Sequence, residues 1–292
     1  METLTLIKGY QDDTVLRKSF NDLAESVFGI QFEEWYQKGY WTEKYKPYSF
    51  LDGKKIVANV SVNRIELLIN TEKITALQIG TVMTHPDFRG RGLSRKLIEK
   101  VLEDYENKYD LMYLFANQTV LDFYPKFGFK IVNEHLFSMS IQKDSESVNK
   151  IIRLDGKNLN DLNFIYQFAS KRVPLSNRFA ASNTQELLMF YCQYVFSKDI
   201  YYIESEEVIA IYQTIGNEVH LYDLISGEEI NIECIVQKIA GQETEKIIFH
   251  FTPESGSTLQ MDIFKSSNTL FVRSGREVVL PEYFKHPITS QA

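Results

Sequence analysis

The chain has little cysteine and no motif with the spacing of a metal site. Its 292 residues include two cysteines, Cys192 and Cys234, and no C-x-x-C or H-x-x-x-H pattern. A secreted chain of this size more often carries a set of disulfides, so we expect a reducing, cytoplasmic location and no bound metal. No apolar run approaches the roughly 20 residues of a membrane helix, and residues 1–8 do not resemble a signal peptide, so no membrane partner is expected.

The chain also lacks a concentration of basic residues. Its formal net charge is -7, with -1 in residues 1–145 and -6 in residues 146–292. Neither half has the basic field that binding to a phosphate backbone requires, so we expect no nucleic-acid partner. An acidic protein attracts cations, which favours a small partner that carries an amine. The composition, 44% hydrophobic and 24% charged, is that of a folded globular protein.

Helical and strand periods alternate along residues 1–140. Gly29 and Gly39 are expected to end the first two helices, and Asp52-Gly53 indicates a hairpin turn. Residues 93–105 have the clearest helical pattern, with apolar residues on one face and charged residues on the other. The expected helices are 13–28, 32–40, 93–105 and 119–126. The expected strands are 49–51, 56–61 (part of a longer strand from about 57 to 69), 74–84, 111–116 and 129–132.

A polar stretch, residues 142–147, is interpreted as a linker between two domains, 1–144 and 145–292. The second half has a similar order of patterns, which suggests a duplicated architecture without sequence repetition. Its expected helices are 158–171, 184–196 and 229–240, its expected strands are 200–204, 207–215, 218–225 and 246–251, and residues 259–280 are expected to be rich in β-structure.

The most informative segment joins a strand to an amphipathic helix through Arg89-Gly90-Arg91-Gly92-Leu93-Ser94. The glycines allow a sharp turn and a close approach of the backbone to a ligand. The free amides and partial positive charge of the helix N-terminus favour an anion of the pyrophosphate kind. The arginines can add charge-assisted hydrogen bonds. The segment matches neither G-x-x-x-x-G-K-[ST] nor G-x-G-x-x-G.

This segment resembles motif A of the GCN5-related N-acetyltransferase (GNAT) family, R/Q-x-x-G-x-G/A, which reads Arg89-x-x-Gly92-x-Ser94 here. The final Ser departs from the usual Gly or Ala. The resemblance covers about residues 1–140. It implies an α/β (α+β) GNAT fold, with a mixed, mostly antiparallel central sheet and flanking helices, followed by a degenerate GNAT-like second domain. It also implies transfer of an acetyl group from acetyl-CoA, as cosubstrate, to a primary amine of a small molecule or peptide.

The resemblance assigns cofactor-binding roles to several residues. The backbone of Val82, Met83 and Thr84 would bind the pantetheine arm, and the side chain of Asn117 would orient it. Arg89 and the amides of Gly90, Arg91, Gly92, Leu93, Ser94 and Arg95 would hold the pyrophosphate. The thioester would then lie between residues 82–84 and the strand at 111–116.

The same resemblance points to Tyr124 as the catalytic acid that protonates the departing CoA thiolate. Residues 117–129 match the family's later motif, in which a Tyr faces the sulfur. A phenol with a pKa of about 10 is protonated at neutral pH, as this role requires. Pro125 departs from the commoner sequence and can kink the expected helix.

The general base stays open in the sequence. His85, Glu33, Glu34 and Glu66 are candidates, and deprotonation through water needs no dedicated residue. For the acceptor amine, the segment between the first helices and the first strand supplies Glu34, Trp35 and Trp41. Aromatic rings beside a carboxylate suit a cationic amine, although the two tryptophans could equally anchor the segment to the sheet.

Two tandem units, the second without motif A, resemble the N-terminal two-thirds of the Eis-like acetyltransferases. The second half is therefore expected to complete the acceptor cleft or to mediate oligomerisation, and to lack a second cofactor site. Larger members of that group place their terminal carboxylate in the active site. Because this chain is too short for their additional domain, no catalytic role is assigned to Ala292.

Two other functions fit parts of the pattern. A non-catalytic acyl-CoA-binding sensor would have the same phosphate-binding segment but would release no CoA. An aminoacyl transferase of the tandem type would take its donor from tRNA, which the acidic balance and the pyrophosphate site disfavour.

Overall fold

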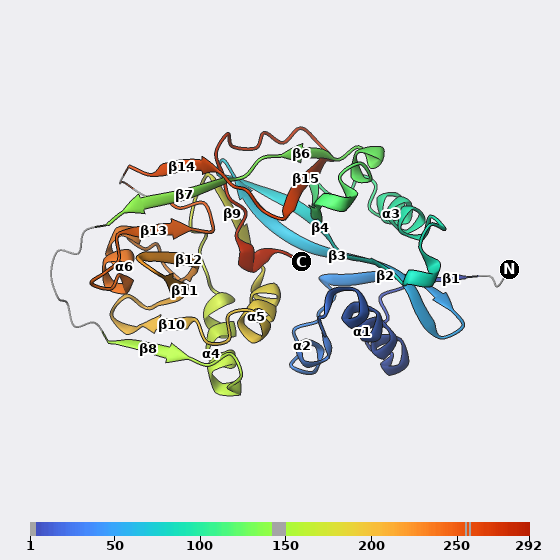
Figure 1. Ribbon diagram of the computed structural model, residues 1–292, viewed down its shortest axis with the longest axis horizontal. Coiled ribbons are helices and arrows are strands. Elements are labelled where there is room, and N and C mark those ends of the chain that lie inside the picture. Colours follow the sequence, from blue (N-terminus) through green and yellow to red (C-terminus); the bar gives the residue numbers. More distant parts are fainter. Residues whose placement is uncertain (1–3, 142–149, 255, 257) are drawn as a thin grey trace.

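The computed structural model describes residues 4–141, 150–254, 256 and 258–292, and they form two β-sheets with helices packed on them (Figure 1). The first sheet has the strand order β1-β2-β3-β4-β5-β15-β6, and β9 pairs with β3 outside this path. Its strands are β1 (Thr5–Lys8), β2 (Tyr45–Asp52), β3 (Lys55–Ile69), β4 (Glu72–Thr84), β5 (Leu111–Asn117), β6 (Lys130–Val132), β9 (Phe179–Ser182) and β15 (Asn268–Ser274).

The second sheet has the order β14-β7-β13-β12-β11-β10-β8. Its strands are β7 (His135–Ser140), β8 (Ile151–Leu154), β10 (Ile200–Ile203), β11 (Val208–Ile215), β12 (Glu218–Ile225), β13 (Lys246–Phe249) and β14 (Gln260–Ile263). Both sheets contain antiparallel neighbours and one parallel pair, β4 with β5 and β12 with β13. The predicted mixed, mostly antiparallel sheet with flanking helices is confirmed, and a second sheet of the same mixed kind accompanies it.

The hairpin of β3 and β4 is the longest element of the first sheet and carries one wall of the site. Asn70 and Thr71 both have positive φ angles, 50° and 69°, as a tight two-residue turn requires. The β-branched residues of both strands alternate toward two apolar clusters, one on each face of the sheet. The predicted strands 57–69 and 74–84 are confirmed.

Helix α1 (Thr14–Phe28) packs on this sheet. The Asp13 side chain accepts hydrogen bonds from the amides of Val15 and Leu16, and Gly29 ends the helix in the left-handed conformation. Helix α3 (Leu93–Asp104) packs on the other face of the first sheet from α1. Its buried contacts are Leu93, Leu97, Ile98 and Val101. The short helix α2 (Glu33–Gln37) follows α1 (Figure 1).

Three helices accompany the second sheet: α4 (Leu159–Ala169), α5 (Gln185–Tyr194) and α6 (Ile232–Ile239). The order β12-α6-β13 repeats β4-α3-β5, a strand, a helix and a parallel strand. At the N-terminus of α6, the Asn231 side chain caps the helix by accepting a hydrogen bond from the Cys234 amide. The N-terminus of α3 has no such side-chain cap.

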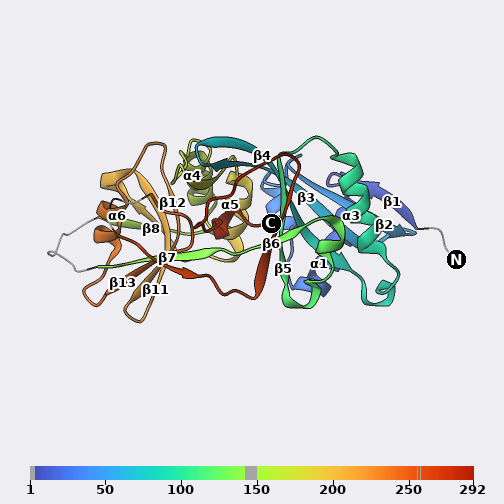
Figure 2. The same ribbon diagram turned by 90° about the horizontal axis from the view of Figure 1, so that it is seen from above.

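Strands are exchanged between the two halves of the chain. β7 precedes residue 144 but belongs to the second sheet, whereas β15 lies between β5 and β6 of the first sheet. The predicted linker, residues 142–147, lies outside the described residues, and the division into 1–144 and 145–292 stays a prediction. Because of the exchange, the two sheets are joined by more than one chain segment (Figures 1 and 2).

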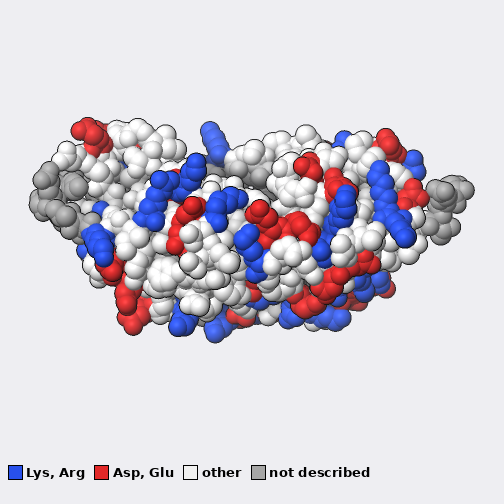
Figure 3. All heavy atoms as spheres, turned by 90° about the horizontal axis from the view of Figure 1, so that it is seen from below, with Lys and Arg blue, Asp and Glu red and all other residues white. Residues whose placement is uncertain are grey.

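Charges of both signs are interspersed on the face of the molecule that Figure 3 shows. Within the described residues, no three His, Cys, Asp or Glu side chains gather as metal ligands would. None of the described helices combines the length and the apolar character that crossing a membrane requires.

Candidate functional site

The site lies where β4 and β5 separate. The two strands pair in parallel from Ala76–Leu111 to Ile79–Leu114, and the remaining residues of β4 have no partner in β5. Just beyond Ile79 the pairing of β4 with β3 shifts register, and Thr81 adopts a positive φ of 47°. The Asn59 side chain donates a hydrogen bond to the Thr81 carbonyl. This β-bulge turns the end of β4 away from β5 and opens the sheet.

A cavity of about 1020 Å³ fills this opening. The ends of β4 and β5 form two of its walls, the N-terminus of α3 forms a third, and residues after α1 and on α5 close the far end. Its lining includes three predicted backbone contacts, Val82, Met83 and Thr84, together with Arg89, Gly90, Gly92, Leu93, Ser94, Arg95, Asn117 and Tyr124. Predicted site residues from position 82 to position 124 therefore meet in one cavity.

The loop before α3 has the geometry of an anion site. Gly90 and Gly92 have φ angles of 76° and 71°, and a Cβ added at either would meet no atom within 4 Å. No side chain caps α3. Among the described residues, no protein group accepts a hydrogen bond from the amides of residues 90–95. We call residues 89–95 the anion cradle, because its exposed amides point from a helix N-terminus into open space.

The side chains of the anion cradle differ in their partners and in whether they line the cavity. The Arg89 Nε donates to the Thr84 carbonyl, 3.3 Å away, and the Ser94 and Thr84 hydroxyls are 2.8 Å apart. Arg91 donates to the Asp87 carbonyl and lies over the Phe88 ring, so its side chain does not line the cavity. Lys126 does line it, and the sequence analysis did not single that residue out.

Tyr124 lies in the 3-10 helix η3 (Tyr124–Phe127) and is 5% exposed. Its ring packs against Phe123, Phe129 and Phe271. Burial raises the pKa of the Tyr124 hydroxyl to about 12, so the phenol is protonated at neutral pH. The predicted single helix 119–126 is wrong: the segment forms η2 (Gln118–Val120) and η3, with Pro125 in the first turn of η3.

Asn117 ends β5 at the cavity. Its side-chain oxygen accepts a hydrogen bond from the Thr119 amide at 3.0 Å, which fixes the carboxamide at the start of η2. The Asn117 side chain is thereby held at the cavity edge, on the strand opposite Val82, Met83 and Thr84.

The three residues predicted to bind the acceptor amine lie in different places in the structure. Trp35 lines the cavity, and its indole N–H donates to the Glu186 carbonyl. Trp41 does not line it; the ring is 4% exposed in the core, and its N–H donates to the Tyr45 carbonyl. Glu34 is exposed and faces Lys38 and Lys157. The short α2 turns Glu34 outward when Trp35 points inward, so the structure does not bring Glu34 and Trp41 to the cavity.

None of the four candidate bases lines the cavity. The His85 ring lies 3.0 Å from the Lys55 ammonium, and the Glu33 carboxylate is paired with Arg17 at 2.9 Å. The Glu66 carboxylate accepts from the Asn183 carboxamide. Each of these side chains is engaged outside the separation of β4 and β5.

Ala292, to which the sequence analysis assigns no catalytic role, lines the cavity. A Cβ built on Gly80 would be 2.8 Å from both the main-chain carbon and oxygen of Ala292. The preceding residues are anchored by hydrogen bonds from Thr289 to Asp223, at 2.6 Å, and between Ser290 and Thr184, at 3.1 Å. Figures 1 and 2 place this segment between the two sheets.

Gly80→Ala should displace Ala292, because an added methyl group cannot fit 2.8 Å from main-chain atoms. We expect turnover to fall roughly 10- to 100-fold, since small displacements at a reacting centre have effects of this size. Release of free thiol from acetyl-CoA measures it. Gly227→Ala is the control, because its nearest neighbour would be an ordinary contact at 3.8 Å. Equal turnover in the two variants would show that the position of Ala292 is unimportant.

The second half of the chain contributes a wall that the sequence analysis anticipated only in general terms. Leu187, Phe190 and Tyr191 of α5 line the cavity, as does Asn268 of β15. The helical pattern of residues 184–196 predicted α5, but no local signal says that this helix crosses to a site more than 60 residues earlier in the chain. The expectation that the second half completes the cleft agrees with this placement.

Comparisons with known proteins agree with this geometry. Residues 12–132 match the family model of the GNAT acetyltransferase domain. A search of curated proteins finds no match. Among solved structures, the chain is similar to a conserved protein from Enterococcus faecalis (TM-score 0.63, 14% identity, 94% of this chain and 73% of that one).

Two further solved structures are similar over the same share of this chain, 94%. Eis1 from Mycobacterium abscessus has a TM-score of 0.60 and 10% identity, with 73% of its chain covered. A GCN5-related N-acetyltransferase from Kribbella flavida has a TM-score of 0.57 and 14% identity, with 72% covered. At these identities the likeness concerns the fold. Residues 12–132 therefore match the GNAT acetyltransferase domain, and the chain has the same fold as these solved structures.

Proposed function

We propose that this protein transfers an acetyl group from acetyl-CoA to a primary amine. The observation that carries the proposal is the anion cradle: unpaired amides at the N-terminus of α3 open into the cavity between β4 and β5. The open space beside Gly90 and Gly92 would hold the diphosphate, and Arg89, Arg95 and Lys126 would supply positive charge on the same lining.

The residues along the cavity are arranged for acyl transfer. The unpaired backbone of Val82, Met83 and Thr84 would bind the pantetheine arm as an added strand, with Asn117 on the opposite side. The amine nitrogen attacks the thioester carbonyl carbon, and the carbon–sulfur bond then breaks. Tyr124 gives its proton to the departing thiolate.

The amine must lose a proton as the new bond forms. The main-chain oxygen of Ala292 lies on the cavity lining and offers a hydrogen-bond acceptor to the amine. A water molecule can carry the proton onward to solvent, so no side-chain base is required. We propose this route because none of the described lining side chains is a carboxylate or a histidine.

The test combines calorimetry with a thiol-release assay. Acetyl-CoA should bind to the purified chain, and release of CoA should require an added amine. Binding without release for any amine would favour the acyl-CoA-binding sensor. No binding at all would overturn the proposal.

Gly92→Ala should weaken CoA binding at least tenfold, because the left-handed φ of 71° is unfavourable for alanine and the cradle must change shape. Isothermal titration with CoA measures the change. Gly216→Ala is a matched control: its φ is 61°, its added Cβ also meets nothing within 4 Å, and it lies in the turn between β11 and β12. Similar affinities of both variants for CoA would show that CoA binding does not depend on the shape of the anion cradle.

A further inference from the structure

The far end of the cavity is built from apolar side chains. We call this part the acceptor lobe and define it by the residues after and at the end of α1, the start of α2 and the facing side of α5: Val27, Phe28, Ile30, Phe32, Trp35, Leu187, Phe190 and Tyr191. The Phe32 ring stacks on Phe190 at a centroid distance of 5.3 Å, so the two helical segments meet across it. Phe28 is 46% exposed and lies at its edge.

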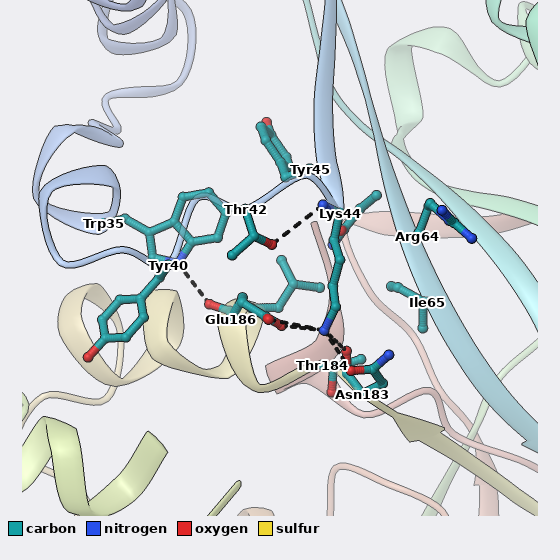
Figure 4. A pocket seen from close by; sticks show the side chains of 12 residues that line it. Trp35, Tyr40, Thr42, Lys44, Tyr45, Arg64, Ile65, Asn183, Thr184 and Glu186 are labelled. Carbon is teal, nitrogen blue, oxygen red and sulfur yellow. Dashed lines mark hydrogen bonds and ion pairs between the residues drawn. The ribbon is translucent and has the colours of Figure 1, made fainter. Parts of the chain in front are cut away.

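No carboxylate side chain belongs to the lining among the described residues. Carboxylates on the same elements are turned away and paired. Glu33 binds Arg17, and Glu186 binds Lys44 with a closest distance of 2.9 Å. Figure 4 shows the Glu186 carboxylate beside the Lys44 ammonium in a separate small pocket. Trp35 lines both that pocket and the cavity.

The polar atoms of the aromatic residues are mostly occupied too. The Trp35 indole N–H is used by the Glu186 carbonyl, and the Tyr45 hydroxyl is paired with the Thr81 hydroxyl. Both residues therefore present ring surface to the cavity. Burial raises the pKa of the Tyr191 hydroxyl, so it remains neutral at physiological pH. The side chains of the lobe can bury an apolar body, and none of them is a counterion for a second positive charge.

We propose that the acceptor is a monoamine with an aromatic or branched aliphatic body, and that substrates with a second cationic group are excluded. This inference rests on the proposed acetyl transfer. The reacting nitrogen must be neutral to attack, so it needs no carboxylate. A second ammonium group in the lobe would lose its hydration without gaining a partner, which is strongly unfavourable. The apolar body instead gains from burial against Phe28, Phe190 and Trp35.

The first experiment compares two amines on the unmodified protein with acetyl-CoA. 2-Phenylethylamine and 1,4-diaminobutane each present a primary amine on a flexible carbon chain, and they differ in the second group. We expect kcat/KM for 2-phenylethylamine to be at least tenfold higher. Equal or higher values for the diamine would overturn the inference and leave acetyl transfer in place. CoA binding without transfer to any amine would instead overturn the proposed function, and the inference with it.

The second experiment adds a carboxylate to the lobe. Phe28→Glu should raise the diamine-to-phenylethylamine ratio of kcat/KM about tenfold, and its exposed position tolerates a charged side chain. Val15→Glu is the control, because Val15 is 54% exposed at the other end of α1 and does not line the cavity. The same ratio in both variants would contradict the inference.

The third experiment asks whether the lobe holds the acyl chain. Octanoyl-CoA and acetyl-CoA are compared with 2-phenylethylamine as acceptor. We expect acetyl-CoA to have the higher kcat/KM, because the amine's body occupies the lobe. A preference for octanoyl-CoA would assign the apolar surface to the acyl donor and overturn the inference.

Discussion

Tyr124→Phe is expected to lower kcat by about 10²- to 10⁴-fold, the range for removal of a positioned general acid. The variant loses one oxygen and keeps the ring that packs against Phe123, Phe129 and Phe271. No described residue hydrogen-bonds the Tyr124 hydroxyl, so the core should stay intact. The dissociation constant for CoA should change little. Turnover is measured by thiol release and affinity by calorimetry.

The pH profile gives a second view of the same residue. Because burial raises the pKa of Tyr124 to about 12, its proton is present throughout the range in which the protein can be assayed. The rate should therefore rise with pH as the amine is deprotonated, without a fall near pH 10 from loss of the phenol proton. Tyr109→Phe is the control, since Tyr109 is buried in the same cluster but does not line the cavity. Unchanged turnover in Tyr124→Phe would remove this residue from the mechanism.

Glu134→Gln is expected to reduce the free energy of unfolding by about 3–5 kcal/mol, the cost of leaving one partner of a buried ion pair without its counterion. The Glu134 carboxylate lies 2.9 Å from the Lys285 ammonium and also accepts a hydrogen bond from the His286 amide. The side chains are 5% and 2% exposed. Burial lowers the pKa of Lys285, and the carboxylate opposes this change.

The exposed pair of Lys150 and Glu204 provides the control, with side chains 72% and 51% exposed at 2.7 Å. Glu204→Gln should cost no more than about 1 kcal/mol. Urea unfolding measures both variants. Equal losses would show that the buried pair contributes no more than a surface pair. Because Lys285 and His286 begin the segment that leads to Ala292, the Glu134 variant should also reduce turnover.

The sequence was most informative where a local rule determines the structure. Period-two patterns and a two-residue turn predicted β3 and β4, and the glycines at positions 90 and 92 predicted a cradle at the start of α3. Each of these features depends on residues within a few positions of one another. The physical causes are backbone freedom and alternating burial, and both can be recognised from the local sequence alone.

The remaining features depend on contacts between distant segments. Nothing near β15 indicates that it pairs with β5, and nothing in α5 indicates that Phe190 faces Phe32. Trp35 and Trp41 lie in the same segment and both are buried, yet only Trp35 also lines the cavity, which the local sequence does not indicate. The position of Ala292 depends on a buried network that includes Asp223 and Thr184.

The exchange of β7 and β15 has a consequence for the order in which the protein can assemble. The sheet that carries the cradle lacks an internal strand until residues 268–274 have been synthesised, so β5 and β6 remain without their common neighbour while most of the chain emerges. Contacts between such distant segments form slowly because the intervening loop must close first. The sheet that carries the anion cradle is thus completed only after the chain that forms the strands of the other sheet has been made.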